Sequence, residues 1–334
     1  MKSIGITDGY GLDKVTLIEE ELPTINSNEV LVKVSAISLN QLDVMLAKGA
    51  FEKALPHILG SDAFGIVEKI GNEVSAFKIG DRVCTHYIQA WQYGSLKSED
   101  LKSRLGIEQK GVFSEYIAVP EHYLVKAPSN VTSDEAAALP LAGVTAWEAI
   151  VNIGQLKLGQ SVLLQGTGGV SIFALQFAKA IGAKVIILSS NDEKLSKAKV
   201  LGADVIINSK TNPKWAEEVL LATQGLGVDL ALEMSWAGIG QTLQSIKFGG
   251  RIAVVGMLGG MTAELSVLDV MLKSISITAV QAGSKSSFES MNQFIEANDL
   301  KTIIDKVFPL SQSSEALNYF DQGKHFGKVV IAFR

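Results

Sequence analysis

The chain has 334 residues, of which 47% are hydrophobic and 19% charged, and its formal net charge is -5. This length exceeds one simple core, so we expect two domains in a globular protein that is neither disordered nor fibrous. The mild negative charge argues against a nucleic-acid or membrane-surface partner. A single cysteine, Cys84, excludes an internal disulfide, and the N-terminus has no apolar signal segment. We therefore expect a cytoplasmic protein without a membrane span.

The two ends of the chain are predicted to form one mostly-β domain. Strand-like runs bounded by glycine or proline cover residues 29–35, 63–70, 81–86 and 113–119. The tail returns to this pattern, with a helix over 288–297 and strands over 304–308 and 328–333. We expect residues 1–128 and 281–334 to form this domain, with a second domain of residues 129–280 inserted between them. A cleft between two domains is the usual place for a site.

The inserted region alternates short apolar runs with helical stretches. The runs are 162–165, 185–188, 205–207, 228–232, 252–255 and 275–280, and the helices are 172–181, 193–201 and 215–223. Gly182 and Gly202 stand where helix C-terminal glycines belong. This alternation predicts an α/β fold with a doubly wound parallel sheet, built from two βαβαβ halves that bind a dinucleotide.

A glycine-rich turn follows the first apolar run and opens the first helix. Its spacing is Gly166-x-Gly168-x-x-Ser171, with a serine where the dinucleotide fingerprint has a third glycine or alanine. Backbone N–H groups at such a helix start can bind a pyrophosphate, and the alternative is an ordinary tight turn. The position after the first strand favours the first interpretation. The predicted cofactor-binding residues here are Gly166, Thr167, Gly168, Gly169, Val170 and Ser171.

The end of the second predicted strand bears on the choice of cofactor. An acidic residue about 20 positions after the glycine turn would bind the ribose 2′-OH and favour NAD. The matching residue is Ser189, followed by Ser190 and Lys194, which could receive the 2′-phosphate of NADP. In the alternative interpretation, Ser190 and Glu193 form a capping box at the start of the next helix.

Several segments, in order along nearly the whole chain, resemble one family. They are residues 38–43 (SLNQLD), 60–65 (GSDAFG), 80–83 (GDRV), 137–147 (AALPLAGVTAW), 165–179 (QGTGGVSIFALQFAK) and 325–331 (HFGKVVI). The chain resembles the zinc-free branch of the medium-chain dehydrogenase/reductase family, which contains quinone reductases and alcohol-dehydrogenase-like proteins. The resemblance implies a GroES-like domain, a Rossmann domain, and a homodimer or homotetramer.

The resemblance also implies that zinc is absent. At the three places where zinc-dependent relatives hold the catalytic metal, this chain has Asn40, Ser61 and Ala142. None of these residues offers a thiolate or an imidazole, and one cysteine cannot form the structural four-cysteine site. Without a Lewis acid, reduction of an activated small molecule by NADPH is favoured, for example of a quinone or a conjugated enone.

The resemblance assigns further site residues. The two serines and the lysine imply NADP, and Asn208 lies near the adenosine ribose. The turns that face the nicotinamide contribute Val255, Gly256, Met257, Val280 and Gln281. Thr145 is expected to contact the nicotinamide or a phosphate, or to be only a helix N-terminal residue. Asn40 would bind the substrate or the nicotinamide ribose, or would simply hold a turn.

No strong general acid emerges from the sequence. Gln41 occupies a position that is tyrosine in many close relatives, so that proton donor is missing. His86, Tyr87, Trp91, Tyr93 or water could supply the proton instead, and the alternative for each of these residues is packing at the surface or in the wall of the cleft. Two other functions therefore stay open: a zinc-independent alcohol/aldehyde dehydrogenase, and an NADPH-binding sensor or structural protein with little turnover.

Overall fold

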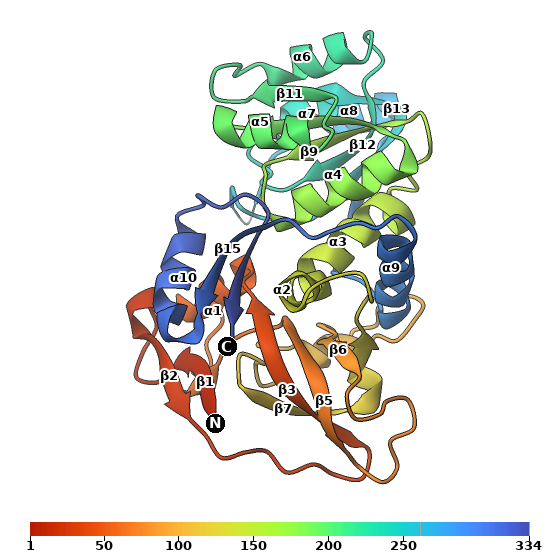
Figure 1. The fold of residues 1–334 in the computed structure, drawn as a ribbon. Coiled ribbons are helices and arrows are strands. Elements are labelled where there is room, and N and C mark those ends of the chain that lie inside the picture. Colours follow the sequence, from red (N-terminus) through yellow and green to blue (C-terminus); the bar gives the residue numbers. More distant parts are fainter. Residues whose placement is uncertain (261, 334) are drawn as a thin grey trace. The chain divides into compact units, whose positions relative to one another are not determined.

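The computed structural model describes residues 1–260 and 262–333, which form two compact units (Figure 1). Unit 1 comprises Met1–Val144 and Ala282–Arg334, and unit 2 comprises Thr145–Gln281. The sequence analysis expected the divisions after residues 128 and 280. Within the described part of the chain, no helix has the length and apolar character needed to cross a membrane.

Unit 1 is built on a seven-stranded sheet in the order β15-β16-β3-β5-β6-β8, with β7 also paired to β3. These strands are β3 (Glu29–Ser38), β5 (Ala63–Ile70), β6 (Arg82–Thr85), β7 (Tyr116–Pro120), β8 (Leu124–Lys126), β15 (Ile304–Pro309) and β16 (Lys328–Ala332). A smaller sheet has the order β2-β1-β4, with β1 (Lys2–Ile6), β2 (Val15–Glu19) and β4 (His57–Ile58). The α-helices of unit 1 include α1 (Gln41–Ala47), α2 (Ser133–Ala137), α9 (Lys285–Ala297) and α10 (Ser313–Asp321).

The tail of the chain completes this sheet. Strand β16 pairs antiparallel with β3 and parallel with β15, so the blue C-terminal strands lie beside the orange β3 in Figure 1. The fully buried residues Val329, Val330 and Ile331 of β16 join the core at this point. The mostly-β domain therefore needs both ends of the chain, because one of its central strands comes from the last residues.

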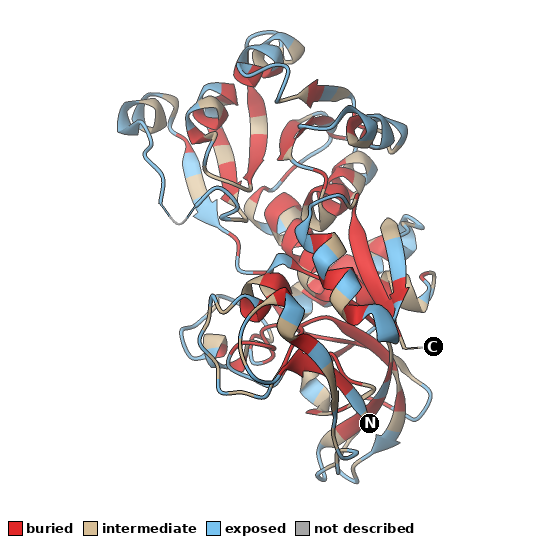
Figure 2. Ribbon diagram, turned by 90° about the vertical axis from the view of Figure 1, so that its left-hand side faces the viewer, coloured by how far each residue is buried: buried red, intermediate tan, exposed pale blue. Residues whose placement is uncertain are grey.

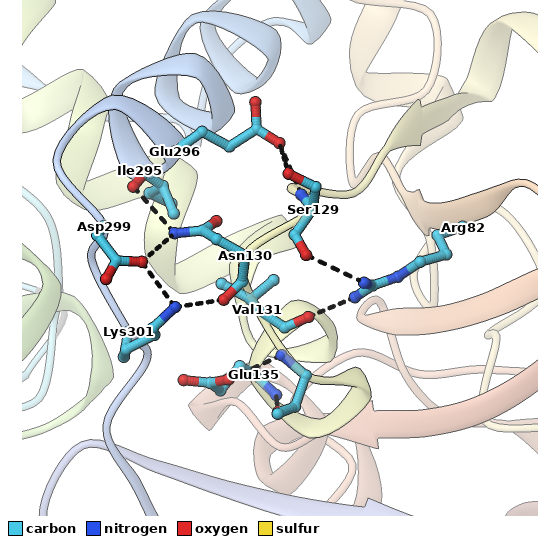
Figure 3. Close-up of polar contacts among 10 residues, drawn as sticks. Arg82, Ser129, Asn130, Val131, Glu135, Ile295, Glu296, Asp299 and Lys301 are labelled. Atoms are coloured by element: carbon cyan, nitrogen blue, oxygen red, sulfur yellow. Dashed lines mark hydrogen bonds and ion pairs between the residues drawn. The ribbon is translucent and has the colours of Figure 1, made fainter.

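The segment just after residue 128 is bound to the same unit (Figure 3). The backbone N–H and hydroxyl of Ser129 donate to the Glu296 carboxylate at 2.6 and 2.8 Å. The Asn130 amide donates to the Ile295 carbonyl at 3.3 Å and to Asp299 at 3.2 Å. These bonds attach the segment to the end of α9, which explains why unit 1 extends beyond residue 128.

Unit 2 is a six-stranded sheet in the order β11-β10-β9-β12-β13-β14, and all of its strand pairs are parallel. Its strands are β9 (Ser161–Gln165), β10 (Lys184–Ser189), β11 (Val205–Asn208), β12 (Val228–Glu233), β13 (Ile246–Val254) and β14 (Ser276–Ala279). Its helices include α4 (Gly169–Ile181), α5 (Asp192–Val200), α6 (Trp215–Ala222), α7 (Ile239–Ser245) and α8 (Val267–Lys273). This order confirms the predicted doubly wound fold, in which β9 and β12 flank the switch point.

Burial explains why these strands read as continuous apolar runs. Val162, Leu163 and Leu164 of β9 are completely buried, as are Ile186 and Ile187 of β10. Helices cover both faces of a parallel sheet, so its central strands need apolar side chains on both sides. Figure 2 shows most strands buried and the outward faces of the helices exposed.

Candidate functional site

The glycine turn lies at the carboxyl end of β9 and has open space around its backbone. Gly166 has a φ of 77°, in the left-handed region that favours glycine. A Cβ atom added at Gly166 or Gly168 would meet no protein atom within 4 Å. Gly168 has an extended backbone, φ -78° and ψ -177°, which any residue can adopt. Neither packing nor backbone geometry requires glycine at 168, so a bare backbone there fits the approach of a pyrophosphate.

Ser171 closes the turn against the strand. Its hydroxyl donates to the carbonyl of Gln165 at 2.8 Å, and its side chain is buried. The serine therefore fits the place of the small third residue of the fingerprint. Because the hydroxyl bonds the chain itself, Ser171 serves the shape of the turn.

The adenosine end corrects one alternative from the sequence. The N-cap of α5 is Asn191, whose side chain accepts the N–H of Lys194 at 3.0 Å. The hydroxyl of Ser189 accepts the N–H of Asn191 at 3.3 Å, which holds the chain just before the helix. The capping box of Ser190 and Glu193 is therefore wrong, because the helix begins one residue later and Glu193 pairs with Lys197 at 3.2 Å.

Asn208 joins the end of β11 to the start of α5. Its Nδ2 donates to the Asp192 carboxylate at 2.7 Å, and its Oδ1 accepts the N–H groups of Lys210 and Thr211. The Asn208 amide is thus bonded to the Asp192 carboxylate, two residues after Ser190. Its predicted contact with the adenosine ribose stays a prediction.

The two turns expected to face the nicotinamide follow β13 and β14, at the same sheet edge as the glycine turn. The N–H groups of Val255 and Gly256 donate to the Glu233 carbonyl at 2.9 and 3.3 Å, and Val280 donates to Val254 at 2.8 Å. A Cβ at Gly256 would lie 2.6 Å from the Met234 carbonyl oxygen, so packing alone requires this glycine. The side chains of Met257 and Gln281 are exposed, whereas Val280 is buried.

Thr145 begins unit 2 within the short helix α3 (Val144–Trp147). π-Helical turns, Leu139–Gly143 and Glu148–Ile153, lie on either side of α3, and such turns are frequent at functional sites. The Thr145 side chain is buried, and its hydroxyl bonds no residue in the part of the chain that the structure describes. The hydroxyl oxygen keeps some solvent exposure, and a hydroxyl with no bond to a described residue suits a ligand contact.

Asn40 belongs to a buried polar cluster of unit 1. It is the N-cap of α1, and its side-chain oxygen accepts the ammonium of Lys328 at 2.7 Å. Lys328, which is 2% exposed, also donates to the carbonyl of Leu39 at 2.8 Å. The completely buried Asp43 accepts the backbone N–H of Asn40 at 2.7 Å. The amide of Asn40 is thus engaged by its own chain, and its contact with a substrate or ribose stays a prediction.

Asp62 is the second buried carboxylate of this cluster. It accepts the hydroxyl of Ser61 at 2.8 Å and the N–H of Leu141 at 3.3 Å. Burial raises the pKa of Asp43 to about 8, and the nearby Asp62 adds to the shift. Burial also raises the pKa of Asp62 and lowers that of Lys328. Lys328 was not predicted from the sequence; a lysine leading the apolar strand KVVIA was the available signal.

The donors at the three former metal positions do not fit zinc. Ala142 has no donor atom, Ser61 is bonded to Asp62, and the oxygen of Asn40 lies 2.7 Å from a buried ammonium. Over residues 1–260 and 262–333, no three His, Cys, Asp or Glu side chains are grouped so that they could hold a metal ion. A zinc centre needs thiolate, imidazole or carboxylate ligands and no cation among them.

Three titratable groups lie in β6 or just after it, and burial shifts the pKa of each. Cys84 is completely buried, which raises the pKa of its thiol. Burial lowers the pKa of His86 to about 4, so its ring is neutral at pH 7, with Nε2 3.0 Å from the Gly283 carbonyl oxygen. Burial raises the pKa of the Tyr87 phenol, which therefore stays protonated. No described residue bonds this phenol, and its oxygen keeps some solvent exposure.

A further buried carboxylate lies in unit 2 and was not predicted from the sequence. Glu233 ends β12 and is completely buried at the switch point, where Gln165 ends the neighbouring β9. Its signal was an acid that closes the apolar strand VDLALE.

The fold and these sites together define a two-domain oxidoreductase with a Rossmann-like unit. The model of the alcohol dehydrogenase GroES-like domain matches residues 26–129, and that of the zinc-binding dehydrogenase matches residues 169–297. A zinc-type alcohol dehydrogenase-like protein of Schizosaccharomyces pombe is 39% identical over 331 residues, covering 96% of each chain. Human quinone oxidoreductase is 28% identical, covering 88% of this chain and 86% of its own. A crystal structure of an NAD-dependent alcohol dehydrogenase is 31% identical, with a TM-score of 0.90 and full coverage of both chains.

The chain therefore belongs to the medium-chain dehydrogenase/reductase family, as its sequence motifs predicted.

Proposed function

We propose that this protein is an NADPH-dependent oxidoreductase that transfers hydride to a quinone, an enone or a similar activated carbonyl compound without zinc. One observation carries the proposal. A buried ammonium, that of Lys328, lies 2.7 Å from Asn40 at a former metal position, while the glycine turn of the Rossmann-like unit stays open. These two features support a protein that binds the cofactor and works without a Lewis acid. Such a protein suits acceptors that are already activated.

The residues of unit 2 would hold the cofactor, which supplies the hydride when it is bound. Open space surrounds Gly166 and Gly168, and the backbone of residues 166–170 would receive the pyrophosphate. The hydroxyls of Ser189 and Ser190, with Lys194, would receive a 2′-phosphate, and no acid replaces Ser189 to repel it. The NAD-dependent relative makes NAD the competing cofactor, so the preference must be measured.

As hydride arrives, negative charge develops on the acceptor oxygen, and a donor must stabilise it and then supply a proton. Tyr87 fits this role best among the groups near β6. Its phenol is protonated and has no partner among the described residues, whereas the His86 ring is neutral at pH 7 and its Nε2 lies 3.0 Å from the Gly283 carbonyl oxygen. Cys84 is completely buried and cannot reach an acceptor.

The proposal is tested by following NADPH oxidation with a panel of quinones, enones and aldehydes, together with a zinc assay of the purified protein. We expect reduction of quinones or enones by protein that contains no stoichiometric zinc. Tight binding of NADPH without reduction of any acceptor would instead support the sensor or structural role. Stoichiometric zinc would contradict the metal-free mechanism.

A second candidate is a zinc-independent alcohol/aldehyde dehydrogenase. The similarity to the NAD-dependent alcohol dehydrogenase favours it, because that relative matches the whole chain. Oxidation of simple alcohols by NADP or NAD, faster than the reduction of any quinone or enone, would establish this function instead.

We also propose that the protein works in the cytoplasm as a homodimer formed through unit 2, from which a homotetramer could be built. Strand β14 is an edge of the sheet, and the adjoining helix α8 exposes Val267, Leu268, Met271 and Leu272 by 63–71%. Two copies of an edge strand can pair antiparallel about a two-fold axis and cover such a face. We expect Met271→Asp to yield monomers in light scattering, and an unchanged mass would contradict this interface.

A further inference from the structure

Glu233 is a buried carboxyl group whose oxygens are bonded only by neutral donors. It is completely buried and belongs to no ion pair in the described part of the chain. One carboxylate oxygen accepts Gln165 Nε2 at 2.9 Å and the Thr242 hydroxyl at 2.6 Å. The other accepts the backbone N–H groups of Ser235 at 3.2 Å and Trp236 at 2.9 Å. A buried charge persists only when such donors satisfy it.

The first oxygen connects this carboxylate to the glycine turn. Gln165 is the last residue of β9, and its side-chain oxygen accepts the N–H of Met234 at 3.1 Å. The backbone carbonyl of the same glutamine accepts the Ser171 hydroxyl, which closes the turn. The orientation of Gln165 is therefore set from both ends of its amide.

The second oxygen connects it to the other cofactor-facing turn. Trp236 has a φ of 62°, a strained conformation for a bulky residue, and its N–H bond to Glu233 holds it there. The carbonyls of Met234 and Ser235 then accept the N–H groups of Leu258 and Gly259 at 3.2 and 3.0 Å. The shape of residues 255–260 thus depends on a loop that the carboxylate of Glu233 pins.

We propose that Glu233 is a positioning residue that holds the nicotinamide-facing turn 255–260 in register with the phosphate-binding turn. The proposal rests on the proposed function, because it assumes that unit 2 binds NADP. It predicts an uneven effect on the two halves of the cofactor. The predicted adenosine half, at Ser189 and Ser190, lies at the end of β10, and no side-chain hydrogen bond among the described residues joins these serines to Glu233.

The experiment compares Glu233→Gln with wild type by calorimetric titration of NADPH and of 2′,5′-ADP, which lacks the nicotinamide half. A glutamine amide presents a donor to one pair of donors whichever way it turns, so one half of the network is lost. We expect NADPH binding to weaken about tenfold or more, as for the loss of hydrogen bonds to a charge. We expect 2′,5′-ADP binding to change less than about twofold.

Turnover distinguishes a positioning role from a purely structural one, because misplacing the nicotinamide changes kcat and KM differently. We expect kcat to fall in E233Q while KM for the acceptor stays unchanged, because the nicotinamide is misplaced and the acceptor site is not. The matched control is Glu218→Gln, an exposed change of the same charge on α6, which should match wild type throughout.

Equal weakening of NADPH and 2′,5′-ADP, or no weakening of either, would overturn the positioning role. If E233Q does not fold, Gln165→Met tests the proposal, since it removes one donor to Glu233 and leaves the carboxyl group in place. We expect NADPH binding to weaken more than 2′,5′-ADP binding, by a smaller factor than in E233Q. Failure of the wild type to bind either ligand would refute the proposed NADP site itself, which separates the two failures.

Discussion

The two units stabilise buried carboxylates in different ways. In unit 1, Asp43 and Asp62 share a cluster with the buried ammonium of Lys328. In unit 2, Glu233 is bonded by an amide, a hydroxyl and backbone N–H groups. A buried acid compensated by a single cation is sensitive to pH and to loss of that cation. A buried acid bonded by several neutral donors depends less on any one of them. Unit 1 thus holds its buried acids with one ammonium, whereas unit 2 holds Glu233 with neutral donors from several elements.

Removing the cation should break the cluster of unit 1. We expect Lys328→Met to lower the free energy of unfolding by about 3–5 kcal/mol, because it removes the cation that favours ionised Asp62 and leaves the buried Leu39 carbonyl and Asn40 oxygen without their donor. Urea denaturation measures this loss. Lys306→Met, at an exposed lysine 3.9 Å from Glu315, is the control and should change stability by less than about 1 kcal/mol. Similar stabilities for the two variants would show that Lys328 does not compensate the carboxylates.

The pH dependence of stability should identify Asp43. Its pKa is about 8 in the folded protein and 3.8 in its ordinary state, so the folded protein binds the extra proton. Stability is then complete below about pH 4 and falls as the pH rises towards 8, by up to about 1.4 kcal/mol per pH unit. Asp43→Asn imitates the protonated form and should flatten this fall in denaturation curves recorded across the range. A slope that the substitution leaves unchanged would assign the proton to another group.

Turnover should distinguish Tyr87 from its neighbours. We expect Tyr87→Phe to lower kcat about 100-fold, the usual scale for loss of a general acid, while NADPH binding and the melting temperature stay unchanged. Wild-type kcat should not depend on ionisation of this phenol below about pH 9, because burial raises its pKa. The control is Tyr93→Phe at an 80% exposed position. Full activity of Y87F would mean that water or another group supplies the proton.

The adenosine end gives the smallest expected effect. We expect Ser189→Asp to weaken NADPH binding about tenfold and to spare NADH, because a carboxylate repels the 2′-phosphate and accepts the ribose 2′-OH. Fluorescence titration with both cofactors measures the change. Ser196→Asp on the outer part of α5 is the control. A wild-type preference for NADH would contradict the assignment of Ser189.

The core strands of unit 2 could be predicted because burial on both faces requires apolar residues at successive positions. The predicted runs 162–165, 185–188 and 228–232 match β9, β10 and β12 to within about a residue at either end. Helix α8 was missed, because its apolar residues are exposed and mark no core face. Strand β13 begins six residues before its predicted start at 252, since the register with β12 shifts at an irregularity that apolar patterning does not reveal.

The candidate site also has features that local sequence predicts and features that depend on distant contacts. The glycine turn was predictable, because backbone approach and positive φ restrict the residue types within a few positions of one another. The N-cap of α5 was not, since Ser190 and Asn191 are both good caps. Only the folded backbone shows that the Lys194 N–H donates to Asn191, whose own N–H donates to the Ser189 hydroxyl. The buried carboxylate of Glu233 also depends on partners at Gln165 and Thr242 that lie in other elements.

By itself the sequence determined the family, the parallel Rossmann-like sheet and the residue types at the former metal positions, because each of these depends on local pattern and chemistry. Only the tertiary structure decided which charged group lies beside Asn40. Lys328 and Asn40 are 288 positions apart and meet because β16 pairs with β3. Such a contact follows from strand pairing across the whole chain, and no local pattern encodes it.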